Sequence, residues 1–589
     1  MYVLGISAYF HDAAAAIFKD GKLIAAIEEE KLSRIKHDYN FPENAIQFCL
    51  NEANIKPSDI DYVVFYEKPF IKFERIIKTV IWGFPKTFNL FQESMKNWLF
   101  DKLWIRNVIQ NSLDIPKEKI MFSNHHLSHA ASAFYCSPFN KAAVVTFDGV
   151  GEWATTTFSE GNNNKIKMKK EIKFPHSIGL IYSVFTAFLG FEINEGEYKV
   201  MGMAPYGSPK YTDKVRKVIN SNDDGSFYID SKYISYHYST KKSYSNKFLS
   251  LFGKPRESDS LFFTNKTGYP KYFGNKPKDY EDQIQSNQYY ADIAASIQKV
   301  TEEIIISLLN KIPAEKYDFN LCMAGGVALN SVINGMITDK TQFKNVYIQP
   351  SAGDGGGAVG AVLTFMIDSK LEKRDFIMDH AFWGPEFSND EIKKVLEKSN
   401  YKYIYYQNKE DIQNMIVKDI LENKVIGLFQ NKMEWGPRAL GNRSIIANPT
   451  LEEMKDIVNS KIKFREPYRP FAPSVMEDKI EDIFVTKYKK NVNPNDFMLN
   501  VIKVKSEYID KIPAVSHMGT ARIQSVRKQN KDYYNLIKKF YKITGIPLLL
   551  NTSFNIKGEP IVCSPTDALN TFSKSGLDKL AIGNYYLTK

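Results

Sequence analysis

Cysteine is scarce in this sequence, which has only four cysteines in 589 residues. They are Cys49, Cys136, Cys322 and Cys563. No two of them form a CxxC pair, so the sequence predicts neither a thiolate zinc site nor a disulfide framework. Long runs of lysine and arginine are also absent, which argues against an arm that binds nucleic acid. The net charge of +11 would suit a small anionic substrate, but could equally reflect compositional drift.

Hydrophobic runs long enough to cross a bilayer are absent as well. The longest run, residues 178–191, is typical of a buried helix. Residues 2–8 predict a strand, and no secretion signal comes before them. We therefore expect a cytoplasmic protein without a membrane partner. A chain of this length, with 43% hydrophobic residues, should form two to four domains with large cores.

Histidine is concentrated in one stretch, where three of the nine histidines lie within five positions. If this stretch is a helix, His125 and His129 project from one face. Such a pair by itself is more often an ordinary helix-surface or half-buried pair than a metal site. Asp148 and Asp354 change that balance, because each comes after a predicted buried strand with glycines beside it that leave the carboxylate unobstructed. The pattern therefore favours a site for a metal or a phosphate.

Elements of one kind, a buried strand followed by a turn, recur in the first half of the chain. The first such turn holds His11 and Asp12, and a hairpin and a third strand follow it. Later turns carry glycines, against which a nucleotide could lie close to the backbone. These glycines are Gly149, Gly325, Gly326 and Gly353, and Asn330 is expected in the helix after Gly326. The recurrence is typical of the actin-like ATPase fold, in which the two halves are duplicated.

Three other stretches have weaker patterns. Residues 28–38 form a charged cluster, either a solvated face or the start of an active-site loop. Residues 70–118 are amphipathic and rich in aromatics, which predicts helices that cover the sheet or pair with another subunit. Residues 208–285 are polar and weakly periodic, which predicts an irregular, partly mobile insertion that could act as a substrate lid.

Arginines in turn-like segments mark the last third of the chain. Five arginines and one lysine have this setting: Arg438, Arg443, Arg465, Arg469, Arg522 and Lys463. Guanidinium groups match phosphate oxygens, so these residues predict a phosphate-binding pocket. The alternative is that the arginines pin loops to carboxylates, but few acidic residues occur in the same motifs. A charge-rich stretch at 368–378 predicts a domain boundary before this region.

Nine motifs occur in order along almost the whole chain: GISAYFHDAAAA, HHLSHAASAF, FDGVGE, GEYKVMGMAPYG, MAGGVALN, SAGDGG, EWGPRALGNRS, KFREPYRPFAP and LLLNTSFNIKGEP. The set resembles the O-carbamoyltransferase family of nodulation protein U and the cephamycin and aminoglycoside antibiotic carbamoyltransferases. The resemblance, weakest over 208–285, implies an α/β protein. Residues 1–370 would form an actin-like ATPase domain (the ASKHA, duplicated ribonuclease-H-like fold), similar to the universal tRNA threonylcarbamoyl transferase. Residues 371–589 would form a YrdC-like domain.

The resemblance also implies an activity with two steps. Carbamoyl phosphate and ATP, with Mg(II), would form carbamoyl adenylate in residues 371–589. The carbamoyl group would then pass to a hydroxyl group of a small-molecule or saccharide acceptor in residues 1–370. A metal ion would assist this transfer, with Fe(II) favoured and Mn(II) as the alternative.

The site residues of the family carry over to matching positions. The metal ligands would be His125, His129, Asp148 and Asp354, which leaves His126 as a neighbour. Two histidines and two carboxylates suit a harder divalent ion such as Fe(II) or Mn(II) and argue against a thiolate zinc site. Either His11 or Asp12 would take the proton of the acceptor hydroxyl, with His11 as the first choice. The residues expected to bind carbamoyl phosphate and ATP are Lys463, Arg469, Arg522 and Ser553, with Arg438 and Asn551 nearby.

Two other functions are compatible with parts of the pattern. A tRNA-modifying enzyme would use the same two domain types, but no basic, aromatic platform for RNA is evident. A non-catalytic actin-like scaffold that binds nucleotide would need few of the ligands, whereas all four metal positions and the arginines are present. We therefore expect an enzyme that acts on small molecules without nucleic acid. If residues 70–118 pair with another subunit, a homodimer would result.

Overall fold

The computed structural model describes residues 1–100, 102–488 and 492–589. The chain forms two compact units. Unit 1 consists of Met1–Glu29, His37–Lys266 and Asp279–Asp379. Unit 2 consists of Glu30–Lys36, Thr267–Lys278 and His380–Lys589. Two short segments from earlier in the chain therefore belong to the unit that the C-terminal part builds.

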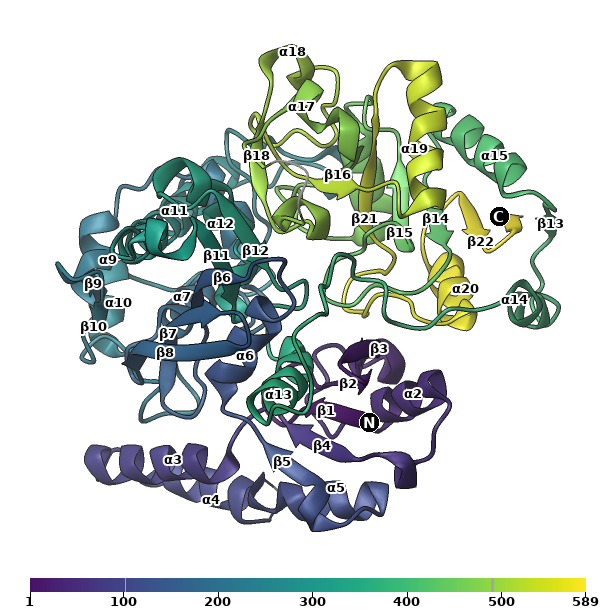
Figure 1. Cartoon of the computed structure of the whole chain (residues 1–589). Helices are drawn as coiled ribbons and strands as arrows, with labels where there is room; N and C mark the ends of the chain where they lie inside the picture. The colour runs from purple at the N-terminus through teal and green to yellow at the C-terminus, as the bar shows by residue number, and fades with distance from the viewer. Residues whose placement is uncertain (101, 489–491) are drawn as a thin grey trace. The chain divides into compact units, whose positions relative to one another are not determined.

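The first sheet of unit 1 has five strands in the order β3-β2-β1-β4-β5 (Figure 1). They are β1 (Tyr2–Ser7), β2 (Ala14–Lys19), β3 (Lys22–Glu28), β4 (Tyr62–Phe65) and β5 (Ile120–Phe122). The first three pair antiparallel, and β4 and β5 continue the sheet in parallel from β1. Successive residues of β1 and β2 are buried on both faces, which explains their continuous hydrophobic sequences.

The second sheet of unit 1 has five strands in the order β12-β11-β6-β7-β8. They are β6 (Lys141–Phe147), β7 (Ala154–Asn162), β8 (Lys165–Lys173), β11 (Asn320–Ala324) and β12 (Asn345–Ile348). Again three strands pair antiparallel, and two more continue in parallel from the first of them. The two sheets thus have the same topology in chain order. This duplication confirms the α/β class and the actin-like fold expected for the N-terminal part.

Helices α6 (His125–Phe134) and α13 (Gly355–Asp368) pack closely against each other in unit 1. A Cβ atom on Gly360 would lie 1.8 Å from the backbone oxygen of Ser128, so only glycine permits this approach. Each helix begins a few residues after the parallel strand that ends its sheet, β5 for α6 and β12 for α13. The packing therefore brings together the loops that carry His125 and Asp354.

Other helices of unit 1 include α2 (Glu43–Ala53), α3 (Pro69–Gly83), α4 (Phe88–Phe100), α5 (Ile105–Leu113), α7 (Ile178–Phe188), α8 (Glu197–Met203), α11 (Tyr280–Asn310) and α12 (Ser331–Lys340). Of these, α2 packs on β2 and β3, α5 on β5 and α7 on β7. Helix α7 is the buried helix expected from the longest hydrophobic run, and α3, α4 and α5 confirm helices in residues 70–118.

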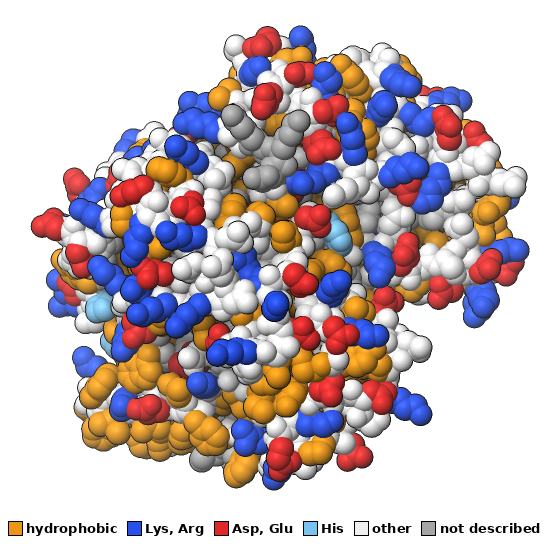
Figure 2. Space-filling model, in the orientation of Figure 1, with side chains coloured by type: hydrophobic (Ala, Val, Ile, Leu, Met, Phe, Trp, Pro, Cys, Tyr) orange, Lys and Arg blue, Asp and Glu red, His pale blue; other side chains and the backbone are white. Residues whose placement is uncertain are grey.

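Helices α3 and α4 lie side by side and share a ring contact between Phe73 and Trp98, with centroids 5.9 Å apart. Their outer surface carries exposed hydrophobic side chains, which Figure 2 shows as an orange area at the lower left. They include Phe70, Ile81, Trp82, Phe84, Phe88 and Phe91. Pairing of this surface with a second copy of the chain stays a prediction.

The 208–285 insertion contains regular structure. It includes α9 (Thr212–Val218), the hairpin of β9 (Ile219–Ser221) and β10 (Phe227–Ile229), and α10 (Asn246–Phe252). Phe248 and Phe252 of α10 pack against Phe185 of α7, with ring centroids 5.1 Å away in both cases. The expectation of irregular structure is therefore wrong for these elements, because spaced aromatic residues anchor the polar segment. A lid role stays a prediction.

Unit 2 contains a mixed sheet in the order β13-β23-β22-β14-β15-β21-β16-β20 and a smaller sheet in the order β17-β18-β19. The strands are β13 (Tyr403–Tyr405), β14 (Ile426–Phe429), β15 (Arg443–Ala447), β16 (Ala472–Met476), β17 (Phe484–Val485), β18 (Val501–Val504), β19 (Thr520–Arg522), β20 (Gln524–Val526), β21 (Leu548–Ser553), β22 (Lys579–Ile582) and β23 (Tyr585–Thr588). The YrdC-like assignment of this unit stays a prediction.

The helices of unit 2 are α1 (Glu30–Ser33), α14 (Asn389–Leu396), α15 (Lys409–Leu421), α16 (Met454–Val458), α17 (Ile480–Ile483), α18 (Ser506–Ile509), α19 (Lys531–Thr544) and α20 (Pro565–Lys574). The amphipathic helix α19 packs on β16 and β21. Across the described ranges of both units, no helix is long and apolar enough to cross a membrane.

Candidate functional site

Four buried side chains converge at the start of α6 and α13 in unit 1. The Nε2 atoms of His125 and His129 lie 3.2 Å apart. Asp148, directly after β6, places Oδ2 3.1 Å from Nε2 of His125. Asp354, directly before α13, places Oδ1 3.4 Å from Nε2 of His129. Loops that follow two strands and the first turn of one helix therefore bring all four expected metal ligands to one point.

The chemistry of these donors fits a divalent ion. All four donor atoms lie within 4.8 Å of one another, a separation compatible with contact to a single ion. Two imidazole nitrogens and two carboxylate oxygens are common ligands of divalent metal ions, and no thiolate belongs to the group. Burial alone would lower the pKa of His125, but the charges of Asp354 and Asp148 raise it well above its usual value. A cation bound between the four side chains would offset the same negative charges.

Neighbouring groups fix the orientation of these ligands. The Glu67 carboxylate lies 3.5 Å from Nδ1 of His125, on the far side of the ring from Asp148. The Tyr66 hydroxyl donates to Oδ2 of Asp354 at 3.3 Å. Such outer partners set the tautomer of a histidine ligand and the orientation of a carboxylate. Neither residue carries a signal in the sequence, because both simply follow the buried strand β4.

His126 is buried but faces away from this point. Its Nδ1 lies 2.7 Å from the Thr146 hydroxyl, and its Nε2 lies 2.8 Å from the backbone oxygen of Ala154. Burial, followed by the charge of His125, lowers the pKa of His126 to about 3. The side chain is a neutral core histidine, in agreement with its expected exclusion from the ligand set.

His11 and Asp12 follow β1 and form a second group in unit 1. Nδ1 of His11 lies 2.6 Å from Oδ2 of Asp12, and its Nε2 lies 3.1 Å from the backbone oxygen of Asn194. Burial lowers the pKa of His11, but the nearby Asp12 carboxylate outweighs this and raises it to about 10. His37 also contacts Asp12, with Nδ1 2.8 Å from Oδ1. Sequence reasoning placed His37 only within a charged cluster.

That charged cluster at 28–38 is not a solvated face. Glu28 and Glu29 are buried, and Lys31 is only 1% exposed. Glu29 accepts hydrogen bonds from the backbone of Ala45 in α2, and Lys31 donates to the backbone oxygen of Glu434 in unit 2. The segment is polar because it satisfies buried backbone groups.

The glycine turns of unit 1 adjoin Asp148. Gly325 has a φ of +91°, and a Cβ there would lie 2.2 Å from the backbone oxygen of Phe147. This close approach lets Gly326 donate its N–H to Oδ1 of Asp148 at 3.0 Å. The helix expected directly after Gly326 is wrong in one detail. Asn330 lies before α12 as its N-cap, where its side chain accepts from the N–H of Ile333. Nucleotide binding by Gly149, Gly325, Gly326, Asn330 and Gly353 stays a prediction.

Lys463 is the centre of the second candidate site, in unit 2. It ends a π-helical turn (Asn459–Lys463) and is 5% exposed. Its ammonium group donates to the hydroxyl of Ser553 at 3.3 Å and to Oδ1 of Asn555 at 2.8 Å. Burial, followed by the charges of Arg465, Arg469 and Lys36, lowers the pKa of Lys463 well below its usual value. The structure thus brings Lys463 and Ser553 together and adds Asn555.

Arg522 belongs to the same basic cluster. The pKa of Arg522 is lowered well below its usual value. Burial is the largest cause, and the positive charges of Arg438, Arg465 and Arg469 add to it. Its Nε is buried and has no hydrogen-bond partner in the part of the chain that the structure describes. The cluster therefore contains Lys36, Arg438, Lys463, Arg465, Arg469 and Arg522. A group of like charges in this setting is suited to bind an anion such as phosphate.

Arg443 has a structural role. Its guanidinium is fully buried and donates to the backbone oxygens of Gln430 and Pro385, among others. It also lies 3.7 Å from the centre of the Phe429 ring. Its interpretation as a phosphate-binding residue is therefore wrong, and so is the alternative of pinning by carboxylates, because its partners are carbonyl groups.

Asn551 supports the loop that carries Arg438. Its amide donates to the backbone oxygen of Ala439 at 3.1 Å and to the Ser474 hydroxyl at 2.9 Å. Glu434 completes the loop by accepting from the backbone N–H groups of Leu440, Asn442 and Arg443. The EWGPRALGNRS motif is thus a loop that its own glutamate organises, with Arg438 at its turn.

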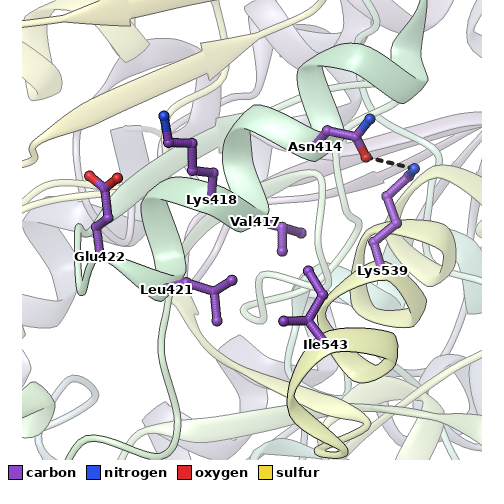
Figure 3. A pocket seen from close by; sticks show the side chains of 7 residues that line it. All are labelled: Asn414, Val417, Lys418, Leu421, Glu422, Lys539 and Ile543. Atoms are coloured by element: carbon purple, nitrogen blue, oxygen red, sulfur yellow. Dashed lines mark hydrogen bonds between the residues drawn. The ribbon is translucent and has the colours of Figure 1, made fainter.

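A hollow of about 560 Å³ lies elsewhere in unit 2, between α15 and α19 (Figure 3). Its lining includes Val417, Leu421 and Ile543, and one hydrogen bond joins Lys539 to Asn414. It contains neither the histidine–aspartate group nor the basic cluster, so its size does not make it the functional site.

Comparison with known proteins adds the family. The carbamoyltransferase N-terminus family matches residues 2–363, and the carbamoyltransferase C-terminus family matches residues 417–589. An uncharacterized protein of Synechocystis is 41% identical over 100% of this chain and 97% of its own length. Nodulation protein NolNO of Sinorhizobium fredii is 33% identical over 99% of this chain and 79% of its own.

Solved structures are more distant. Component A of (R)-2-hydroxyglutaryl-CoA dehydratase from Acidaminococcus fermentans has a TM-score of 0.32 at 15% identity, and the likeness covers 63% of this chain and 100% of that one. This likeness is too low to add to the strand topology. The two family matches together cover most of the sequence. They include both the histidine–aspartate group of unit 1 and Lys463 with the arginines around it in residues 417–589. The chain therefore belongs to the carbamoyltransferase family and is a carbamoyltransferase.

Proposed function

We propose that unit 2 makes carbamoyl adenylate from carbamoyl phosphate and ATP, and that unit 1 transfers the carbamoyl group to a hydroxyl acceptor. The observation that carries this proposal is the basic cluster around Lys463. Positive charges gathered around the buried Lys463 destabilise the protein unless a ligand of opposite charge binds. The phosphate groups of carbamoyl phosphate and of ATP with Mg(II) are ligands of that kind.

In unit 2, the proposed phosphate-binding residues are Lys463, Arg469, Arg522 and Ser553. Arg438 lies in the adjoining loop, and Asn551 on β21 supports that loop. The arginine side chains would bind phosphate oxygens through paired N–H groups. Lys463 would bring a compact positive charge to the same oxygens. Their common task would be to hold two anionic substrates together and to offset the charge that develops during adenylate formation.

In unit 1, His125, His129, Asp148 and Asp354 would hold a divalent ion, with Fe(II) favoured and Mn(II) as the alternative. When bound, the ion supplies positive charge that offsets the negative charge of the adenylate phosphate. The acceptor oxygen attacks the carbamoyl carbon, the bond from that carbon to the phosphate oxygen breaks, and AMP leaves. In its neutral form, with Nδ1 hydrogen-bonded to Asp12, His11 would take the acceptor's proton on Nε2.

The proposal can be tested with carbamoyl phosphate, ATP and a panel of small-molecule and saccharide alcohols. We expect AMP release and a carbamate product, which mass spectrometry detects. Lys463→Met should abolish adenylate formation but still transfer the carbamoyl group from preformed carbamoyl adenylate. Lys461→Met is the matched control, because Lys461 is an exposed lysine of the same π-helical turn. Loss of both activities in Lys463→Met, or no ATP consumption by the unmodified chain, would contradict the proposal.

A further inference from the structure

Two loops of unit 1 meet beside the metal-ligand loop. The N–H of Tyr9 donates to the backbone oxygen of Tyr39 at 2.6 Å, and the N–H of Ala13 donates to that of Asp38 at 2.7 Å. A Cβ on Gly353, next to the ligand Asp354, would lie 3.9 Å from Oδ2 of Asp12. The loop after β1 is thus held by the loop 37–40 and faces the turn before α13.

The backbone at this junction is strained. Asp12 has a φ of +44° and His37 a φ of +54°, in the left-handed region that non-glycine residues rarely adopt. Each such residue costs roughly 1–2 kcal/mol, so the surrounding contacts must hold it there. Strain of this kind is found where side chains are aimed at a functional site. Here the two strained residues aim their side chains at each other.

The Asp12 carboxylate is shared between two histidines. Oδ2 accepts from Nδ1 of His11 at 2.6 Å, and Oδ1 accepts from Nδ1 of His37 at 2.8 Å. The two imidazole rings lie with their centroids 5.0 Å apart. Because a carboxylate only accepts, Nδ1 carries the hydrogen in both rings. With one oxygen bound to each histidine, the plane of the carboxylate is fixed.

This arrangement determines which atom of His11 can act. Nδ1 of His11 is committed to Asp12, so Nε2 is left to exchange a proton with a substrate. In the structure the backbone oxygen of Asn194 lies 3.1 Å from Nε2, and an acceptor oxygen would take its place there. If only Oδ2 of Asp12 accepted a hydrogen bond, the carboxylate could rotate about the Cβ–Cγ bond. The His11 ring would then lose its fixed orientation.

We infer that His37 is a positioning residue for carbamoyl transfer: it anchors the second oxygen of Asp12, and Asp12 in turn directs Nε2 of His11 at the acceptor hydroxyl. This inference rests on the proposed role of His11. His37 is not one of the four proposed metal ligands. Loss of one charge-assisted hydrogen bond in such a chain should slow transfer by about tenfold to a hundredfold.

Two substitutions separate the hydrogen bond from the backbone. Both Asn and Gly accept a positive φ. Only His37→Asn keeps an N–H donor near the position of Nδ1, whereas His37→Gly removes it. We expect His37→Gly to lower kcat for transfer from carbamoyl adenylate about tenfold to a hundredfold with little change in acceptor KM. His37→Asn should stay within about threefold of the unmodified enzyme, since it retains the donor.

A double-mutant cycle tests whether His37 acts through His11. In a His11→Ala background, His37→Gly should cause no further loss of transfer. Adenylate formation and metal content should match the unmodified chain in all variants. Equal rates for His37→Gly and His37→Asn, or an additive loss in the double mutant, would overturn the inference. Absence of transfer by the unmodified chain would instead contradict the proposed function, so the two failures are distinguishable.

Discussion

Replacing Arg522 by methionine should make the protein more stable without ligand and less responsive to phosphate ligands. Arg522 is destabilised by burial and then by Arg438, Arg465 and Arg469, which lower its pKa. Its Nε has no hydrogen-bond partner among the described residues. Replacing a poorly compensated buried charge by an apolar side chain of similar size often stabilises a protein by about 1–4 kcal/mol. For a unit of this size, each 1 kcal/mol raises Tm by about 2–4 °C.

Scanning calorimetry with and without ATP or pyrophosphate measures both effects. At a ligand concentration of 100 times Kd, the unmodified protein should gain about 2.7 kcal/mol. Arg522→Met should start from a higher Tm and lose most of that gain. Arg443→Met is a matched control, because Arg443 is equally charged but donates to backbone oxygens such as that of Gln430. It should destabilise the protein by several kcal/mol. A lower Tm for Arg522→Met with an undiminished response to ligand would refute the reasoning.

Three further predictions concern the metal ligands and pH. Asp354→Asn should reduce bound metal at least tenfold by elemental analysis, whereas His126→Gln should keep it because His126 contacts Thr146 instead. Tyr66→Phe removes a hydrogen bond to Asp354 and should weaken metal affinity about tenfold in a chelator competition, with no change meaning that this bond is unimportant. Burial and, to a lesser extent, the charge of Lys455 lower the pKa of His517 to about 4 in the folded chain. In the unfolded chain this histidine binds a proton near pH 6.5, whereas in the folded chain it binds one only near pH 4. Stability should therefore fall as pH falls below 6.5, by about 2 kcal/mol at pH 5, and urea unfolding of His517→Asn should lack this loss.

The duplicated fold of unit 1 was predictable because its signals are local. Buried strands appear as hydrophobic runs, and the aspartates directly after them stand next to glycine. The close packing of α6 on α13 follows from the glycine at 360, which the sequence also displays. For the same reason the four metal ligands could be named before their convergence was visible. Resemblance to a family supplied the grouping of ligands that lie more than 200 residues apart.

The parts that could not be predicted depend on contacts between distant segments. His37 looks like one more charge in a polar stretch, and only the pairing of its loop with residues 9–13 gives it a role. Arg443 and Arg522 each lie at the end of a strand, yet Arg443 donates to carbonyl groups and Arg522 lies among like charges. Glu30–Lys36 belongs to unit 2 although residues on both sides of it belong to unit 1. The amino-acid composition of this segment does not indicate that it belongs to the other unit.

The two candidate sites are electrostatic opposites, and this contrast indicates what each needs. In unit 1, two carboxylates face two histidines, and the negative charges of Asp354 and Asp148 raise the pKa of His125. In unit 2, burial and the positive charges of Arg465, Arg469 and Lys36 lower the pKa of Lys463. A cation relieves the first site and an anion relieves the second, each by reversing that shift. Buried groups of one sign are costly, so their retention is best explained by ligands of the opposite sign. That pairing is what a reaction needs when one unit binds phosphates and the other accepts the activated product at a metal ion.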